Sequence, residues 1–282
     1  MSRHTQHEEG LAPEVLAFYN AFDEDGRLEQ GSGPLELVRT QEILSRFLPP
    51  PPASVLDVGG GTGVYACWLA VQGYATHLVE PVERLVAAAR RRAAEIPEEQ
   101  RPAVSVGEAR RLPCRDASVD AVLLMGPLYH LAEREERLDA LVEVRRVLRP
   151  GGLLVAAAIS RLASALDGLV SGHAEDPEFL RIVERDLASG RHRNDTAKMD
   201  YFTTAHFHRP DELRLEIEAA GLEHHGTFGV EGPAWLLADL AERLEAPQRR
   251  QALLRVLRLL EREPGALGVS SHLLAVARRF AM

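Results

Sequence analysis

The order of apolar and polar residues along the chain predicts short buried strands that alternate with amphipathic helices. Short apolar runs between turn-forming residues indicate strands, whereas apolar residues spaced three or four apart indicate helices. The predicted strands are residues 54–58, 75–79, 103–106, 119–125, 153–159, 222–230 and 271–279. Since strands that alternate with helices build parallel sheets, we expect an α/β fold with a doubly wound, seven-stranded and mostly parallel sheet.

The helical patterns outside this sheet divide the chain further. Residues 1–50 hold a polar tail and two helical patterns, which predict an N-terminal helical cap ahead of a core at 51–159. The alternation stops at 160–209, where short helical patterns predict a helical lid, because an irregular loop of this length is uncommon. The remainder of the core is expected at 210–282, with a second helical insertion at 232–263.

A glycine-rich turn follows the first predicted strand and marks a candidate ligand site. The turn reads Asp57-x-Gly59-x-Gly61-x-Gly63 and leads into a helical pattern. Glycine permits positive φ and a close ligand approach, and the first amides of a helix favour negative charge. A dinucleotide fingerprint has glycine at its first, third and sixth positions, but the sixth position counted from Gly59 is Val64. The spacing therefore departs from that pattern.

The same turn resembles the first motif of class I S-adenosylmethionine-dependent methyltransferases. Residues 147–154, Val-Leu-Arg-Pro-Gly-Gly-Leu-Leu, are very similar to the junction of the fourth helix and fifth strand in this family. The resemblance covers about residues 54–159 and implies that S-adenosylmethionine is the cofactor. It also implies that the last strand lies antiparallel between its neighbours. The motif residues that it places in the cofactor site are Asp57, Gly59, Gly61 and Gly63.

Residues that follow the next three strands complete the predicted cofactor site. Glu80 ends the second strand 17 residues after Gly63, near the separation at which a carboxylate accepts both ribose hydroxyl protons. It could equally be a solvent-facing glutamate at a helix start. The resemblance implies that Glu108, with Ala109 beside it, recognises the adenine amino group. It also implies that Met125, which ends the fourth strand, faces the sulfonium.

Histidine and tyrosine residues are the candidates for catalysis and substrate binding. His130 follows the fourth strand and can titrate near neutrality, so it is a candidate general base or else packs against the next helix. Tyr19 and Tyr129 suit a substrate pocket wall or a contact with the methionine carboxylate of the cofactor, or else they pack in the core. His206 and His208 would share a face of an extended segment, where they could bind substrate or form a lid hinge. No metal site is predicted, because no further ligand has suitable spacing.

Charge and composition narrow the range of partners. The 42 acidic and 33 basic residues give a net charge of -9, which opposes attraction to phosphate backbones and anionic lipid. Residues 125–129, Met-Gly-Pro-Leu-Tyr, also differ from the Asn/Asp-Pro-Pro-Tyr/Phe motif of base-amine methyltransferases. No apolar run is long enough to span a bilayer. We therefore expect a cytoplasmic protein with no nucleic-acid or membrane partner, and the oligomeric state stays open.

The predicted function is methyl transfer from S-adenosylmethionine to oxygen or nitrogen of a small-molecule acceptor. Enclosing helical segments suit a small acceptor better than a duplex. Two alternatives stay open. The acceptor could be a protein or peptide, which an open groove would favour, or the chain could be a non-catalytic module that binds S-adenosylmethionine.

Overall fold

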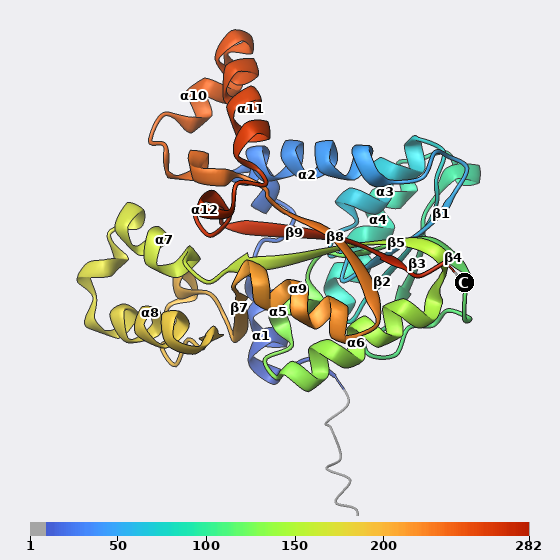
Figure 1. Cartoon of the computed structure of the whole chain (residues 1–282), viewed down its shortest axis with the longest axis horizontal. Coiled ribbons are helices and arrows are strands. Elements are labelled where there is room, and N and C mark those ends of the chain that lie inside the picture. Colours follow the sequence, from blue (N-terminus) through green and yellow to red (C-terminus); the bar gives the residue numbers. More distant parts are fainter. Residues whose placement is uncertain (1–9, 282) are drawn as a thin grey trace, which may run out of the picture.

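The computed structural model describes residues 10–281 and shows a twisted sheet with helices on both faces (Figure 1). Seven strands run in the order β3-β2-β1-β4-β5-β9-β8. They are β1 (Ser54–Val58), β2 (Ala75–Glu80), β3 (Ala103–Val106), β4 (Val119–Leu124), β5 (Leu148–Ser160), β8 (Leu222–Gly229) and β9 (His272–Arg279). The first five pair in parallel, and β9 is antiparallel to both β5 and β8. The predicted sheet and its reversed last strand are confirmed.

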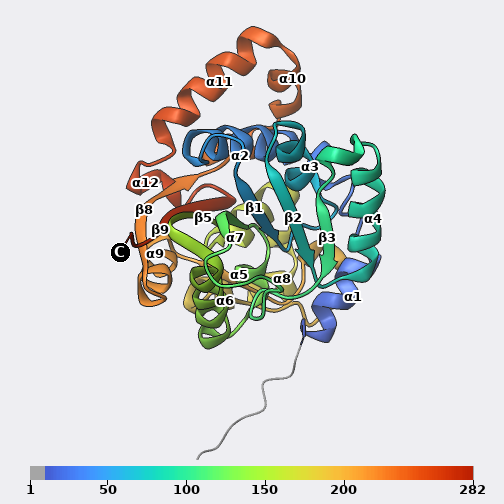
Figure 2. The same ribbon diagram turned by 90° about the vertical axis from the view of Figure 1, so that its right-hand side faces the viewer.

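Two helical layers bury the sheet. The helices α2 (Gly33–Phe47), α3 (Val64–Val71) and α4 (Glu83–Ala94) lie on one side, and α6 (Arg134–Val147) and α9 (Pro210–Ala219) lie on the other (Figures 1 and 2). Successive residues of a strand face opposite layers. In β1, for example, Val55 packs in the core cluster below α2 and α3, whereas Leu56 and Val58 pack in the cluster below α6 and α9. Burial on both faces explains the near-continuous apolar runs in the sequence.

The segment predicted as a helical lid is only partly helical. It contains α7 (Ala163–Ser171) and α8 (Pro177–Ser189), but also two short strands, β6 (Arg191–His192) and β7 (Ala205–His208). Strand β7 pairs in parallel with the end of β5 and antiparallel with β6. The predicted lid therefore contains two short strands besides its helices, because β5 extends beyond β4 and offers an edge that this segment can join.

The remaining helices lie around the sheet edges. Helix α11 projects from one side of the molecule, and its base packs on α2 through an apolar cluster that includes Leu35, Leu254 and Leu257 (Figure 1). These remaining elements are α1 (Pro13–Ala21), α5 (Pro127–His130), α10 (Leu240–Glu245), α11 (Pro247–Leu260), α12 (Pro264–Leu267) and the 3-10 turns at 27–29, 98–100, 173–175, 199–201 and 232–236. None of the helices within residues 10–281 is long and apolar enough to cross a membrane.

A buried ion pair joins the two helices of one layer. Arg137 of α6 donates two hydrogen bonds to Glu216 of α9, at 2.7 Å from Nη2 to Oε1 and 3.0 Å from Nε to Oε2. The Nε2 atom of His208 lies 3.2 Å from the second carboxylate oxygen. Burial alone would raise the pKa of Glu216, but the hydrogen bonds from His208 and Arg137 outweigh it and lower the pKa to about 2.

Removal of one partner of this pair should therefore destabilise the fold. The Glu216→Ala substitution leaves a buried guanidinium without its carboxylate and should lower the free energy of unfolding by about 3–5 kcal/mol. The control is Glu218→Ala on the same helix, which removes an exposed pair with Arg214 and should cost only about 0.3–0.5 kcal/mol. Urea titrations of the two variants provide the measurement. Equal losses would contradict this account of the pair.

Candidate cofactor and acceptor site

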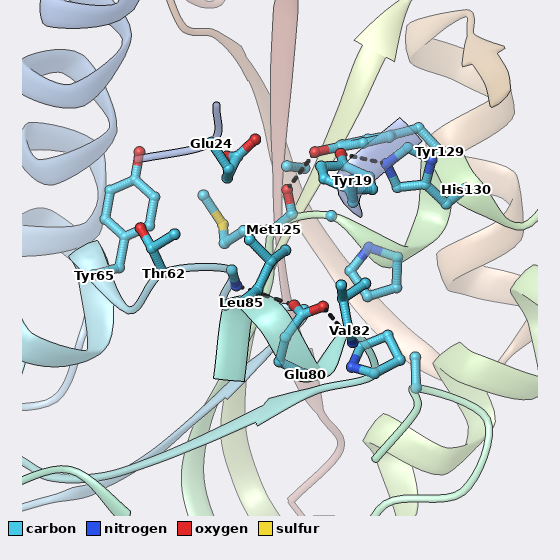
Figure 3. A pocket seen from close by; sticks show the side chains of 18 of the residues that line it. Tyr19, Glu24, Thr62, Tyr65, Glu80, Val82, Leu85, Met125, Tyr129 and His130 are labelled. Atoms are coloured by element: carbon cyan, nitrogen blue, oxygen red, sulfur yellow. Dashed lines mark hydrogen bonds between the residues drawn. The ribbon is translucent and has the colours of Figure 1, made fainter. Parts of the chain in front are cut away.

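A pocket opens at the carboxyl ends of four neighbouring parallel strands. Its lining includes residues that end or directly follow β1, β2, β3 and β4, which are those at 59–62, 80–82, 107–109 and 125–127. The chain leaves β1 toward β2 on one side, while β4 lies on its other side. Open α/β sheets bind ligands at such a change of strand order. The pocket therefore lies where the sheet topology predicts a ligand (Figure 3).

The glycine turn after β1 has a backbone that few other residues could adopt. Gly59, Gly61 and Gly63 have φ values of +67°, +54° and +82°. A Cβ atom on Gly59 would lie 2.6 Å from Cδ of Pro127, so the turn passes too close to α5 for a larger residue. Gly59 and Gly61 line the pocket, and Gly63 is the N-cap of α3. The turn thus leaves its backbone open to a ligand.

Two acidic side chains are buried at the turn. Asp57 is fully buried beneath it, and burial raises the pKa of its carboxyl to about 7. Glu80 lines the pocket, where its carboxylate accepts hydrogen bonds from the amides of Gly61 at 3.1 Å and Val82 at 3.0 Å. Burial outweighs these two bonds and raises the pKa of Glu80 to about 7. The bonds fix the Glu80 carboxylate next to the turn, in a position that suits a ribose diol.

Glu108, Ala109 and Met125 also line this pocket. The Glu108 carboxylate accepts a hydrogen bond of 2.8 Å from Nε of Arg110, which holds it at the end of β3. Tyr129 donates a hydrogen bond of 3.1 Å to the backbone oxygen of Met125. The structure therefore brings the predicted cofactor residues to a single site, with Asp57 and Gly63 supporting the turn behind the pocket surface.

An aromatic group from α1 and α5 forms another wall of the pocket. The hydroxyl of Tyr19 lies 2.7 Å from Nε2 of His130, and the two rings meet edge to face (Figure 3). Tyr129 lies against the same imidazole. Burial lowers the pKa of His130 to about 4, so its imidazole is neutral at pH 7 and is a weak base. The structure thus brings Tyr19, Tyr129 and His130 together, but it places the histidine in a setting that disfavours proton uptake.

His206 and His208 lie elsewhere. Both belong to β7, so the segment is extended, and their rings contact each other at a centroid distance of 4.5 Å. His208 is buried against Glu216, and His206 faces a second hollow between α6 and α9 that Arg137 also lines. The structure does not bring these two histidines to the cofactor pocket.

Several charged residues that the sequence did not assign to the site also line the pocket. Arg27 donates to both carboxylate oxygens of Glu36, at 2.6 and 3.0 Å, and to Glu24 at 3.0 Å. At the start of β9, Nδ1 of His272 lies 2.6 Å from Oε1 of Glu231. No local motif marks these residues, since they come from distant parts of the chain. For His272 the available signal was the predicted antiparallel last strand. Such a strand begins at the edge of the sheet where the parallel strands end, which is also where the pocket lies.

The fold and the site together define a class I methyltransferase domain of the S-adenosylmethionine-dependent type. Comparison with known proteins agrees, since residues 56–156 match the methyltransferase domain family. A methyltransferase of known structure from Methanosarcina mazei, described as S-adenosylmethionine-dependent, shares the fold with a TM-score of 0.59 at 18% identity. That match covers 85% of this chain and 98% of the other. Residues 56–156 therefore form a methyltransferase domain, and the class I fold around them implies S-adenosylmethionine as the cofactor.

Curated relatives share the domain but differ in the names of their acceptors. The ubiquinone/menaquinone biosynthesis C-methyltransferase UbiE of Acidiphilium cryptum is 32% identical over 126 residues, which are 44% of this chain and 49% of that protein. The probable tRNA methyltransferase 9B of Mus musculus is 36% identical over 106 residues, which are 37% of this chain and 21% of that protein. The chain thus spans about half or less of the length of these relatives.

The Glu80 carboxylate gives a test of the cofactor site. Replacement by the neutral amide in Glu80→Gln removes a charged acceptor and should weaken S-adenosylmethionine binding by about 10- to 100-fold. The control is Glu83→Gln, which changes an exposed glutamate at the start of α4 and should bind as the parent does. Isothermal titration calorimetry measures both. Unchanged affinity in Glu80→Gln would contradict the ribose role.

The same titration should depend on pH. The raised pKa of Glu80, about 7, means that the carboxylate gains a proton as pH falls through this value, and the protonated form accepts fewer hydrogen bonds. Affinity should therefore fall between about pH 8 and pH 6. Asp57 titrates in the same range, so any pH dependence that persists in Glu80→Gln belongs to Asp57.

Proposed function

We propose that the chain transfers a methyl group from S-adenosylmethionine to an oxygen or nitrogen atom of a small molecule. The observation that carries this proposal is the continuity of the pocket. The glycine turn and Glu80 line one part, and Tyr19, His130 and His272 line another part of the same space. A ligand held at the first part would have room beside it for an acceptor.

For this reaction the protein has to do little more than position the acceptor and the cofactor relative to each other. S-adenosylmethionine supplies a methyl group on positive sulfur, which is already activated for transfer. The chain has to hold the acceptor in line with that methyl group, and correct placement can contribute about 7–11 kcal/mol of the barrier. In this proposal Glu80 holds the ribose, Glu108 faces the adenine, and Met125 lies toward the reacting end. Tyr19 and Tyr129 form the acceptor wall.

A small acceptor fits the setting better than a macromolecule. Helix α1 covers one side of the pocket through Tyr19, whose backbone oxygen accepts hydrogen bonds from Arg84 of α4. This tie holds α1 close to the cofactor part of the pocket. The net charge of -9 also disfavours a tRNA acceptor. We therefore favour a small acceptor over the tRNA in the name of the Mus musculus relative.

A transfer assay with labelled cofactor tests the proposal. The purified chain should bind S-adenosylmethionine and move the labelled methyl group to compounds in small-molecule pools, with little transfer to peptides or tRNA. The Glu80→Ala variant is the background control. Transfer only to peptides would favour a protein or peptide methyltransferase, transfer to tRNA would refute the acceptor class, and binding without any transfer would favour a non-catalytic module.

A further inference from the structure

A histidine that the proposed mechanism has not yet used lies in the acceptor part of the pocket. His272 is the first residue of β9 and lines the pocket together with Glu36 and Leu274. Because β9 runs against its neighbour β5, its first residue lies opposite Ile159 near the carboxyl end of that strand. The antiparallel strand therefore delivers an imidazole to the edge of the sheet where the cofactor motif also ends.

Glu231 orients this imidazole. The Glu231 side chain is fully buried, and its Oε1 atom lies 2.6 Å from Nδ1 of His272. Its Oε2 atom accepts hydrogen bonds of 3.0 Å from the Ser270 hydroxyl and from the backbone amide of His272. A carboxylate can only accept here, so it holds the proton on Nδ1. The Nε2 atom makes no hydrogen bond to residues 10–281 and can act toward a ligand.

The charged groups around His272 favour proton uptake. Glu36 lies 3.7 Å from Nδ1, Glu231 lies 2.6 Å away, and Arg27 is paired with Glu36 and Glu24. The cluster therefore holds three carboxylates, those of Glu24, Glu36 and Glu231, beside the Arg27 guanidinium and the His272 imidazole. Burial works against the protonated imidazole, but the Glu36 and Glu231 carboxylates outweigh burial and the opposing Arg27, and they raise the pKa of His272 to about 9.

The hydrogen bonds of this cluster favour a protonated imidazole over a bound metal ion. Glu36, Glu231 and His272 place possible ligand atoms within 4.8 Å of one another. However, both oxygens of Glu36 accept hydrogen bonds from Arg27, and both oxygens of Glu231 already have donors. A cation would have to displace a guanidinium that lies against the same carboxylate.

We propose that His272, oriented by Glu231, accepts the proton of the methyl acceptor, and that the acceptor is therefore an alcohol, phenol or amine. This inference rests on the proposed function. As the acceptor oxygen or nitrogen bonds to the methyl carbon, the carbon–sulfur bond breaks and leaves its electron pair on sulfur. The proton of the O–H or N–H group moves to Nε2 of His272. Glu231 and Glu36 balance the imidazolium charge that results.

The arrangement distinguishes His272 from His130. The Nε2 atom of His130 is already bonded to the Tyr19 hydroxyl, and burial depresses its basicity. A carboxylate acceptor would need no base at all, because it carries no proton at neutral pH. The Glu231–His272 pair is therefore expected only with a nucleophile that must lose a proton.

The test measures methyl transfer from labelled cofactor by the parent, His272→Gln and Glu231→Gln. The acceptors are alcohols, phenols and amines, together with matched carboxylates. Transfer should go to the first three classes, and His272→Gln should lower kcat by about 100- to 10,000-fold with little change in acceptor KM or cofactor affinity. The matched control is His225→Gln, an exposed histidine on β8, which should keep the parent rate. Transfer confined to carboxylates, or a His272→Gln rate within threefold of the parent, would overturn the inference.

The pH profile separates a proton-accepting role from a structural one. Only the neutral imidazole accepts a proton, so kcat/KM of the parent should rise with pH, reach half of its maximum near pH 9 and level off above that pH. Glu231→Gln removes a neighbouring carboxylate and should move this rise to lower pH, while His272→Gln should lose it. An unmoved profile in both variants would refute the role of His272. Failure to bind S-adenosylmethionine would instead refute the proposed function.

Discussion

The hydrogen bond from the Gly59 amide to the Val79 backbone oxygen, at 2.7 Å, ties the glycine turn to the second strand, and the site depends on it. It continues the parallel register that sets Val58 opposite Val79. Because Glu80 is the next residue, its carboxylate reaches the Gly61 amide directly. Strand pairing therefore determines where the candidate ribose carboxylate lies, and a register slip would move it to the other face of the sheet.

The parts of the fold that could be predicted are those that leave a local pattern in the sequence. Strands buried on both faces leave apolar runs, and a turn with positive φ leaves glycines, so Gly59, Gly61 and the sheet followed from the residues themselves. The lowered pKa of the His130 imidazole could not be predicted in this way. It depends on burial and on Tyr19, which lies 111 positions away in the sequence. Short β7 was left inside the predicted lid because its residues, Ala-His-Phe-His, lack the apolar run that marks the equally short β3.

The proposed acceptor side of the pocket differs from the proposed cofactor side in how its polar groups are held. The turn presents backbone and one carboxylate, whereas the acceptor side presents charges that are already matched, Arg27 with Glu36 and His272 with Glu231. Charges that are taken out of water have to be paired, and pairing also restricts their motion. Side chains held in this way can orient a small acceptor before any reaction begins. Such tertiary pairs leave no mark in a single sequence.

The residues that line the pocket come from segments far apart in the sequence. The proposed cofactor part comes from residues between Gly59 and Met125, whereas the other walls come from residues 10–40 before it and from residues 126–131, 157 and 230–274 after it. Chimeras could therefore exchange the flanking segments between homologues and keep the nucleoside contacts intact. A change of acceptor would then require no change in the residues that hold the nucleoside.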